Sequence, residues 1–359
     1  MKKSMLLQMY LNENFGDDMF LDLIAKRFPK VEFELIGNIP QVYVNKYHNV
    51  KVYRLNPLRA KLDKLFRYVF HKNIYLDLRQ SKNHGVVILG GSVFMDKPLA
   101  KRIYKTRMNS IKCGKPFFVI GANFGPAFSQ LFVDNYHEFF ARCHDVCFRD
   151  SISADCFADI ESVRYQPDVV FNMVKRDEEI LRGQVGISII DLEDGSHKTI
   201  GNLKSSYEKK MVELIDDILR GGYCVRLYSF CNKQGDLRAI NRIMGRLSNP
   251  NHVNLSSYYY HDLKLNEFDI DFARNEYIIA TRFHSMILGI KNGQKVFPII
   301  YDDKTRSVIK DLNIKNYCDL KTIDSVTVSQ VLEANVVKGI ERLSKEAQLQ
   351  FKGLDKYIS

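Results

Sequence analysis

Residues 276–290 read EYIIATRFHSMILGI, and their pattern indicates the fold class most clearly. The apolar run Glu276–Ala280 has the length and β-branched content of a buried strand. After the five linking residues Thr281–Ser285, the run Met286–Ile290 has the pattern of a packed helix. A buried strand that leads directly into a helix is the repeating unit of an α/β protein with a parallel sheet. The stretch therefore predicts that Arg282 and His284 lie at the carboxyl end of a strand.

That position favours ligand binding, since open α/β sheets hold their ligands outside the carboxyl ends of the strands. The first turn of the following helix also offers backbone N–H groups to an anion. Arg282 and His284, with Lys304 close behind them, predict a small and highly charged ligand. We take His284 as the acid–base candidate, because an imidazole titrates near neutral pH.

The same alternation of short apolar runs and helical patterns fills the chain, which predicts an α/β fold. Strands are expected at 5–11, 32–37, 86–89, 117–121, 145–149, 163–165, 185–190, 223–229, 252–254, 277–281 and 296–300. Helices are expected at 17–28, 57–71, 97–110, 131–142, 152–159, 205–220, 236–246, 261–265, 284–292, 305–311 and 326–350. A length of 359 residues suits two domains.

We therefore predict two doubly wound Rossmann-like domains that face a cleft. The charged stretch that begins at Asn172 is the best boundary between them. The N-terminal domain is expected over 1–175 and the C-terminal domain over 183–325. A C-terminal helical segment, 326–359, is expected to return to the first domain.

Glycines mark three of the expected strand-to-helix turns of the first domain. A glycine lets the backbone approach a ligand closely, although most such turns only reverse the chain. Neither the dinucleotide-binding fingerprint nor the P-loop lysine motif is present. Three such turns at strand ends predict that the following residues line the cleft: Gly16, Asp17, Gly90, Gly91, Ser92 and Asn123.

Arg149 ends another predicted strand, and its planar guanidinium could bind a carboxylate or phosphate with two hydrogen bonds. The alternative is a structural ion pair with Asp150 or Asp168. Its place at a strand end favours a functional role for Arg149. For Asp168, which follows a short strand, we favour a structural role as a cap or arginine partner.

Two patterns superficially resemble metal sites. Cys143, Cys147 and Cys156 lie near His144, but the paired spacing of structural zinc sites is missing, so reduced thiols in a cytoplasmic protein are expected. The motif Asp269-Ile270-Asp271 has the form that holds a metal–nucleotide in some sugar transferases, yet it falls in a helical pattern. We therefore predict no metal site.

Positive charge is concentrated in residues 51–115, which hold sixteen Lys or Arg against three Asp or Glu, a net charge of +13. A predicted helix within this basic segment combines an apolar face with flanking cations: Leu62, Leu65, Phe66, Val69 and Phe70, with Lys61, Lys64, Arg67 and Lys72. It could lie on an anionic membrane or hold a phosphate-bearing acceptor, or it could pack on its own domain. No nucleic-acid-binding signature accompanies the charge, so no nucleic-acid partner is expected.

The chain has no apolar run that approaches the ~20 residues of a membrane span. The first residues reach the polar stretch at Asn12 too soon for a signal peptide and are read as a strand. We expect a cytoplasmic protein, and the basic segment leaves open a peripheral position at the inner face of the cytoplasmic membrane.

Taken in order, these motifs resemble the polysaccharide pyruvyl transferase family, and the Arg-x-His-Ser block is the most specific of them. The matching residues are Asn14 to Asp18, Gly90-Gly91, Gly121 with Gly125-Pro126, Arg149-Asp150 with Ser153, Pro167-Asp168 with Phe171, Gly186 to Ser188, Arg282 to Ser285, Gly293, Pro298, Tyr301 and Lys304. The chain departs from the family pattern at Ser92, where a third glycine is usual, and at Phe283, where leucine is common.

The resemblance implies a fold similar to the two-domain GT-B glycosyltransferases. It also implies transfer of the enolpyruvyl group of phosphoenolpyruvate to a sugar, free or lipid-linked, with release of phosphate and no cofactor. The product would be a pyruvate ketal on an exopolysaccharide or capsule precursor. The residues expected around the donor are Arg149, Arg282, Phe283, His284, Ser285 and Lys304, with His284 and Arg282 in catalysis.

Two other interpretations stay open at this point. A GT-B-type nucleotide-sugar glycosyltransferase of surface polysaccharide synthesis would use a similar cleft, with Arg282 and Lys304 on a diphosphate. A carboxylate with the spacing expected for ribose binding is not evident, however. A non-enzymatic assembly or lipid-binding protein would explain the basic segment but not the pairing of Arg282 with His284.

Overall fold

The computed structural model describes residues 3–11, 13–37, 39, 44–54, 56–70, 73–97, 99–127, 129–193, 200–259 and 265–359, with backbone alone at Arg67 and Val69. The chain forms two compact units. Unit 1 comprises Met1–Leu11, Phe20–Asn172 and Ser344–Ser359, and unit 2 comprises Asn12–Met19 and Met173–Leu343. Each unit has its own parallel sheet and its own buried core.

Unit 1 is built on a seven-stranded sheet in the order β3-β2-β1-β4-β5-β6-β7, with every neighbouring pair parallel. Its strands are β1 (Ser4–Gln8), β2 (Glu32–Ile36), β3 (Val50–Tyr53), β4 (Gly85–Leu89), β5 (Phe117–Ala122), β6 (Asp145–Phe148) and β7 (Val163–Tyr165). β4 and β5 are buried along their whole length, as strands covered on both faces must be. The strand order reverses between β1 and β4.

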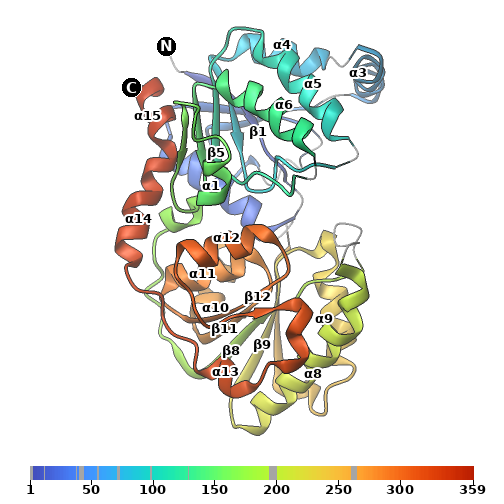
Figure 1. The fold of residues 1–359 in the computed structure, drawn as a ribbon, viewed down its shortest axis with the longest axis vertical. Helices are drawn as coiled ribbons and strands as arrows, with labels where there is room; N and C mark the ends of the chain where they lie inside the picture. The colour runs from blue at the N-terminus through green and yellow to red at the C-terminus, as the bar shows by residue number, and fades with distance from the viewer. Residues whose placement is uncertain are drawn as a thin grey trace. The chain divides into compact units, whose positions relative to one another are not determined.

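Helices surround this sheet (Figure 1). They are α1 (Phe15–Arg27), which begins in unit 2, α3 (Pro57–Phe70), α4 (Ile74–Lys82), α5 (Ala100–Ile111), α6 (Gln130–Ala141), α7 (Ser151–Asp155), the end of α14 (Ile340–Gln348) and α15 (Lys352–Ile358). Side-chain caps begin several of them, for example Ser129 at α6 and Asp150 at α7. The C-terminal α15 is tied to the sheet, since the Tyr357 hydroxyl donates to the carbonyl of His84.

Unit 2 is built on a six-stranded parallel sheet in the order β10-β9-β8-β11-β12-β13. Its strands are β8 (Leu181–Ser188), β9 (Cys224–Ser229), β10 (Val253–Ser257), β11 (Asn275–Ala280), β12 (Lys295–Ile300) and β13 (Cys318–Asp319). The strand order reverses between β8 and β11, so the expected ligand position of this sheet lies beside the end of β11.

The helices of unit 2 are α8 (Lys204–Arg220), α9 (Asp236–Met244), α10 (Leu265–Ala273), α11 (Phe283–Asn292), α12 (Asp303–Asp311) and α13 (Val328–Leu332), with the start of α14. Helix α11 is almost entirely buried. It lies close to the sheet because Gly289 has no side chain, and a Cβ there would come within 2.8 Å of Val296. Gly293 ends the helix in the left-handed conformation, with φ at 80°.

These two sheets confirm the predicted fold, two doubly wound Rossmann-like domains. All eleven predicted strands are present, whereas β3, β13 and helix α4 match no predicted range. Helix α10 meets the range 261–265 only at Leu265, and α15 lies beyond the helix expected over 326–350. The single helix expected over 326–350 is wrong, since α13 and α14 are separate and Gly339 between them has φ at 80°. The helix expected over 261–265 lies largely outside the described residues.

The chain crosses between the units more often than the expected ranges 1–175, 183–325 and 326–359 allow. Residues 12–19 belong to unit 2 and not to the N-terminal unit, because Phe15 packs against Phe230, Tyr258 and Phe268. At the other end, residues 326–343 stay in unit 2, and only 344–359 return to unit 1.

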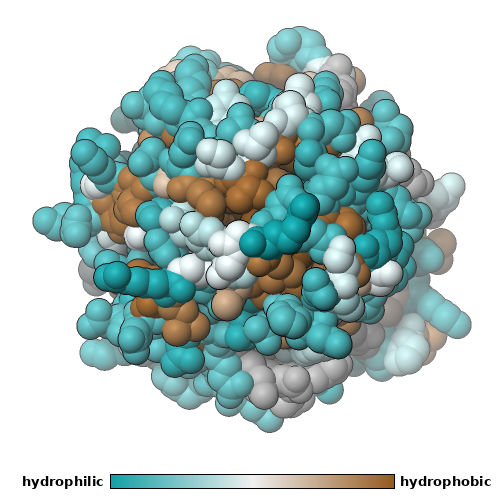
Figure 2. All heavy atoms as spheres, turned by 90° about the horizontal axis from the view of Figure 1, so that it is seen from below, coloured by the Kyte–Doolittle hydropathy of each residue, from teal (hydrophilic) through white to brown (hydrophobic). Residues whose placement is uncertain are grey.

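The surface is mostly hydrophilic on the face shown in Figure 2, with hydrophobic residues visible between hydrophilic ones. Single exposed apolar residues such as Leu255 and Val336 are ordinary for a water-exposed surface. Among the described residues, no helix has both the length and the apolar character that crossing a membrane requires.

Candidate functional site

His284 lies in the first turn of α11 and is half-buried. Its imidazole occupies the space that Gly16 leaves by lacking a side chain, since a Cβ on Gly16 would lie 1.8 Å from His284 Nδ1. The two residues are far apart in the sequence, and both belong to unit 2. Gly16 and Asp17, which we expected to line a cleft of the N-terminal domain, thus belong beside the predicted acid–base residue.

The segment that carries Gly16 is firmly attached to unit 2. The Phe15 amide donates to the carbonyl of Phe230 at 3.0 Å, and the Tyr258 hydroxyl donates to Asp18 at 2.7 Å. Phe15 and Asp18 are both fully buried. This attachment fixes Gly16 against the imidazole. It also explains why residues 12–19 belong to unit 2, although their position in the sequence predicted the N-terminal domain.

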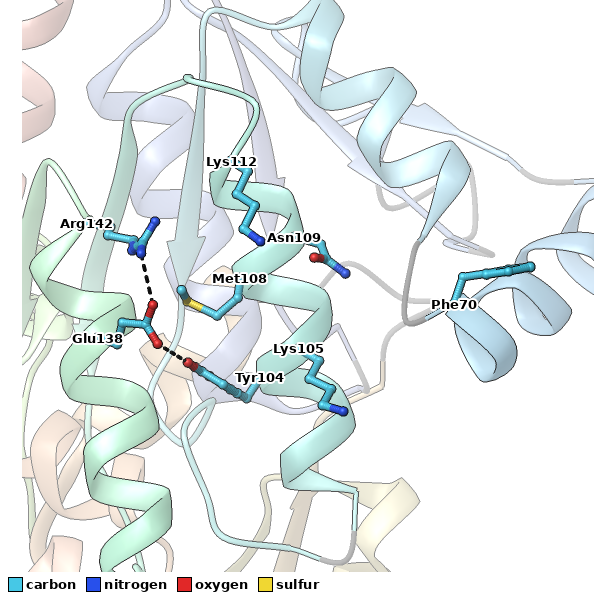
Figure 3. Close-up of a pocket in the computed structure, with 8 residues that line it drawn as sticks. All are labelled: Phe70, Tyr104, Lys105, Met108, Asn109, Lys112, Glu138 and Arg142. Carbon is cyan, nitrogen blue, oxygen red and sulfur yellow. Dashed lines mark hydrogen bonds and ion pairs between the residues drawn. The ribbon is translucent and has the colours of Figure 1, made fainter.

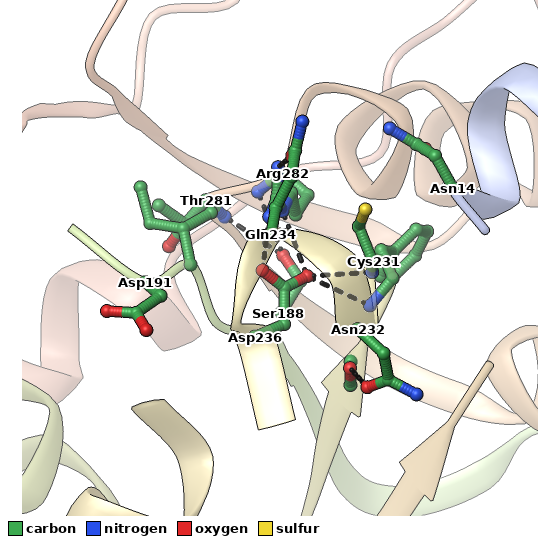
Figure 4. Close-up of polar contacts among 12 residues, drawn as sticks. Asn14, Ser188, Asp191, Cys231, Asn232, Gln234, Asp236, Thr281 and Arg282 are labelled. Atoms are coloured by element: carbon green, nitrogen blue, oxygen red, sulfur yellow. Dashed lines mark hydrogen bonds and ion pairs between the residues drawn. The ribbon is translucent and has the colours of Figure 1, made fainter. Parts of the chain in front are cut away.

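Arg282 forms a buried ion pair with Asp236, the first residue of α9 (Figure 4). The carboxylate of Asp236 is fully buried and also accepts hydrogen bonds from the amides of Phe230 and Cys231 at 3.1 and 2.9 Å. Arg282 donates to Gln234 as well. Burial opposes the charge on Arg282, but Asp236 more than compensates and raises the pKa of the guanidinium. The sequence analysis missed Asp236, although it follows the end of β9 at a helix start, a position that could have marked it.

The turn from β11 into α11 is fixed by Ser188, the last residue of β8. The Ser188 hydroxyl oxygen accepts hydrogen bonds from the amides of Thr281 and Arg282 at 3.0 and 3.1 Å. Beyond the turn, the buried hydroxyl of Ser285 has no hydrogen-bond partner among the described residues. An unpartnered buried hydroxyl is unusual in a folded protein, and this one lies in the first turn of α11.

Lys304 also lies near this helix start. Its Nζ is 5.8 Å from the centre of the Phe283 ring and 3.2 Å from Asp302, the N-cap of α12. Burial works against the charge on Asp302, while Lys304 and Thr305 outweigh it and hold the pKa of the carboxyl below its usual range. Arg282, Phe283, His284, Ser285 and Lys304 are therefore gathered at the carboxyl edge of the unit 2 sheet.

Arg149 belongs to unit 1 and is almost fully buried, with 2% of its surface exposed. It donates to Asp168 at 3.0 Å and to Asn123 at 2.8 Å, which confirms the structural role favoured for Asp168. Gly91 lies directly against this arginine, since a Cβ on Gly91 would come within 2.4 Å of Arg149 Nη2. The Ser92 hydroxyl donates to Asn123 at 3.2 Å.

The predicted site residues thus form two groups. Gly91, Ser92, Asn123 and Arg149 come together in unit 1, next to Gly90, which has φ at 132°. The other predicted residues come together in unit 2: Gly16, Asp17, Arg282, Phe283, His284, Ser285 and Lys304. Their role in donor binding stays a prediction, as does the cleft.

The residues that superficially resembled metal ligands have other partners. Asp269 accepts from Arg176 at 2.6 Å, and Asp271 pairs with Arg226 at 2.7 Å. All seven cysteines are free thiols. Across the described ranges, no three His, Cys, Asp or Glu side chains are grouped as metal ligands would be.

The strand order of both sheets, with a histidine and cations at a helix start, defines a two-domain Rossmann-like protein of the GT-B kind. The chain belongs to the polysaccharide pyruvyl transferase family, whose model matches residues 14–303. The family predicted from the motif order is therefore confirmed.

One curated relative is the amylovoran biosynthesis protein AmsJ of Erwinia amylovora, which is 24% identical over 254 residues. That match covers 64% of this chain and 59% of the relative, so the chain spans less than two thirds of the relative's length. Two solved structures share the fold. Anabaena HepE in complex with UDP and glucose is 11% identical with a TM-score of 0.58, over 100% of this chain and 99% of that one. Staphylococcus aureus (S. aureus) MnaA with UDP is 10% identical with a TM-score of 0.61, over 99% and 97%.

Proposed function

We propose that this protein transfers the enolpyruvyl group of phosphoenolpyruvate to a sugar of a polysaccharide precursor and releases phosphate. The product is a pyruvate ketal that bridges two hydroxyls of the sugar. The observation that carries the proposal is the placement of His284 in the first turn of α11, with Arg282 and Lys304 beside it and Gly16 leaving room for the imidazole. Family membership supports the same chemistry.

The reaction needs an acid and a base but no oxidant or reductant. Protonation of the methylene carbon of phosphoenolpyruvate creates an oxocarbenium-like centre at the adjacent carbon. One sugar hydroxyl attacks this carbon, the bond from carbon to the phosphate oxygen breaks, and the second hydroxyl closes the ketal. The two hydroxyls lose two protons in total. One compensates for the proton delivered to the methylene carbon, and the other is taken up by the released phosphate.

His284 is the group that we assign to proton transfer, as acid toward the methylene carbon or as base toward a hydroxyl. The start of α11 adds the partial positive charge of a helix N-terminus, which favours the phosphate or carboxylate of the donor. Asp236 holds Arg282 in place, and Asp302 holds Lys304. The N–H groups of both cations are therefore oriented before phosphoenolpyruvate binds. Such preorganisation lowers the barrier, because the site does not reorganise as charge develops.

The test compares donors. HepE and MnaA were solved with UDP, so UDP-sugars are the informative alternative donors. We expect phosphate release from phosphoenolpyruvate that requires an acceptor, with a panel of free and lipid-linked galactosides, glucosides and N-acetylmannosamine sugars. We also expect phosphoenolpyruvate alone to raise the melting temperature by linkage. Turnover of a UDP-sugar, without phosphate release from phosphoenolpyruvate, would assign the protein to the glycosyltransferases instead.

The acceptor belongs to the same proposal. A sugar at the end of a lipid-linked precursor is presented at a membrane surface, so an enzyme that modifies it gains from a peripheral contact with that membrane. The basic segment 51–115 supplies the charge for such a contact, and helix α3 supplies the surface.

A further inference from the structure

Helix α3 of unit 1 carries an apolar stripe that its own unit leaves uncovered. Leu58, Leu62 and Leu65, spaced four and three residues apart, lie on one side of the helix. They are 68, 42 and 56% exposed. The aromatic residues Tyr68 and Phe70 are more than half exposed as well. Of the alternatives left open for this helix, packing on its own domain does not hold for these leucines.

The charges of α3 are arranged around this stripe. Arg59, Lys61 and Lys64 are exposed, while the single acidic residue of the helix, Asp63, is buried and accepts a hydrogen bond from the amide of Tyr75. The outward surface of α3 thus presents leucines and cations without a carboxylate. An amphipathic helix with these properties is typical of helices that lie in the headgroup region of a membrane.

A shallow basic groove lies next to the end of α3 (Figure 3). It has a volume of about 400 Å³. Its lining residues are Phe70 of α3, Tyr104, Lys105, Met108 and Asn109 of α5, Lys112 directly after α5, Glu138 of α6 and Arg142 directly after α6. Its one carboxylate, Glu138, is already engaged by the Tyr104 hydroxyl and by Arg142. Lys105 and Lys112 are exposed at the groove.

We propose that α3 and this groove form a surface that binds an anionic membrane. The leucine stripe enters the headgroup region, and the lysines of the groove contact lipid phosphates. The basic segment 51–115 has a net charge of +13, whereas the whole chain has +11, so the remaining residues sum to −2. Attraction to a negative leaflet is thus concentrated where the apolar stripe lies.

Charge also argues against a second copy of the chain as the occupant. Two α3 helices in contact would bring exposed Lys61 and Lys64 against the same residues of the other copy, with no carboxylate on the outward face to balance them. Membrane binding itself does not depend on the donor chemistry. Only the inference that the membrane presents a lipid-linked acceptor rests on the proposed function.

The first experiment is co-sedimentation of the full chain with phosphatidylglycerol or phosphatidylcholine vesicles, at low and high salt. We expect binding to phosphatidylglycerol alone, and loss of binding in high salt. Lys61→Glu/Lys64→Glu should weaken binding by roughly 30-fold or more, because each basic residue lost near such a surface lowers the affinity about fivefold. Lys310→Glu/Lys338→Glu makes the same charge change at exposed positions of unit 2 and should bind like the wild type.

The second experiment reports on the stripe directly. The chain contains no tryptophan, so Leu65→Trp introduces a single reporter on the stripe and Tyr317→Trp a matched exposed reporter in unit 2. Phosphatidylglycerol vesicles should shift the emission of the Leu65→Trp variant to the blue and leave that of the Tyr317→Trp variant unchanged. Because both changes are at exposed positions, folding is expected to survive.

Three outcomes would overturn the proposal. The first is wild-type protein that ignores phosphatidylglycerol vesicles, and the second is a Lys61→Glu/Lys64→Glu variant that binds them as well as the wild type. The third is a concentration-dependent dimer of the wild type that a Leu62→Ser/Leu65→Ser variant does not form. Phosphate release from phosphoenolpyruvate, measured with a water-soluble acceptor, is a separate readout. Failure of membrane binding with that activity intact contradicts this surface and leaves the proposed function standing.

Discussion

At the scale of single residues, each predicted cation of the site has a specific carboxylate partner. Arg149 pairs with Asp168, Arg282 with Asp236 and Lys304 with Asp302. The sequence marked the cations, because each follows a predicted strand and arginine suits an anionic ligand. Asp236 also follows a predicted strand, but its pairing with Arg282 could not be predicted, because the two residues lie 46 positions apart and meet at the carboxyl ends of β9 and β11, on either side of β8.

Gly16→Ala tests whether Gly16 is a positioning residue for His284. The new methyl group would collide with the imidazole, so the ring must leave its place. We expect the turnover number to fall by roughly 10²–10⁴-fold, the usual contribution of a positioned acid or base. Phosphoenolpyruvate should still raise the melting temperature, since the cations stay in place.

The double variant Gly16→Ala/His284→Gln is the control for this prediction. If Gly16 acts only through the imidazole, the double variant should be no slower than His284→Gln alone. Additive losses of the turnover number would show that Gly16 acts on the reaction independently of the imidazole. An unchanged turnover number in Gly16→Ala would show that His284 does not transfer the proton.

Asp236→Asn tests the buried ion pair. The substitution leaves the Arg282 guanidinium buried without its countercharge, so the free energy of unfolding should fall by about 3–5 kcal/mol. Denaturation in urea measures this loss. Glu213→Gln removes a carboxylate from the exposed pair with Lys209 on α8 and should change the same quantity by less than about 1 kcal/mol. Equal losses in the two variants would contradict a structural role for the buried pair.

At the scale of elements, the apolar pattern predicted the central strands well, because runs such as β4 and β5 are buried on both faces. It failed at the sheet edges. β3 is only partly buried, and β13 has two residues, so neither carries a continuous apolar run. The break between α13 and α14 was missed because the helical pattern continues across Gly339, although that glycine takes the left-handed conformation.

Helix α11 makes a prediction about pH through Lys291, in its last turn. Burial lowers the pKa of this lysine to about 8 from its ordinary 10.5, while Asp269 acts in the opposite direction. Between those pH values the unfolded chain holds a proton that the folded protein has released, so the stability contributed by Lys291 rises with pH. Below about pH 8 the folded state carries the full cost of a buried charge, which is of the order of 3 kcal/mol.

Lys291→Met should therefore raise the free energy of unfolding at neutral pH, by up to about 3 kcal/mol, and flatten its rise between pH 8 and 10.5. Urea denaturation across this range measures both effects. Lys310→Met, at an exposed position, is the matched control and should leave the profile unchanged. A loss of stability in the Lys291→Met variant would mean that the charge of Lys291 is favourable where it lies.

At the scale of the whole molecule, the two-domain organisation could be predicted from strand–helix alternation and one charged boundary. The assignment of residues 12–19 to unit 2 and of 344–359 to unit 1 could not, because it depends on contacts between distant parts of the chain. Gln350 illustrates this. Its buried amide accepts from Gly121 and donates to the carbonyls of Phe148, Gln166 and Pro167, and so ties the C-terminal segment to unit 1.

Pyruvyl transfer from phosphoenolpyruvate can be tested by the mass of the acceptor sugar after reaction in heavy water. If the methylene carbon is protonated by an enzyme acid that exchanges with solvent, the ketal should carry one deuterium in its new methyl group. His284→Gln should form the same labelled product roughly 10²–10⁴-fold more slowly. A wild-type enzyme that forms no pyruvate ketal with any acceptor of the panel, or forms one without deuterium, would contradict the account.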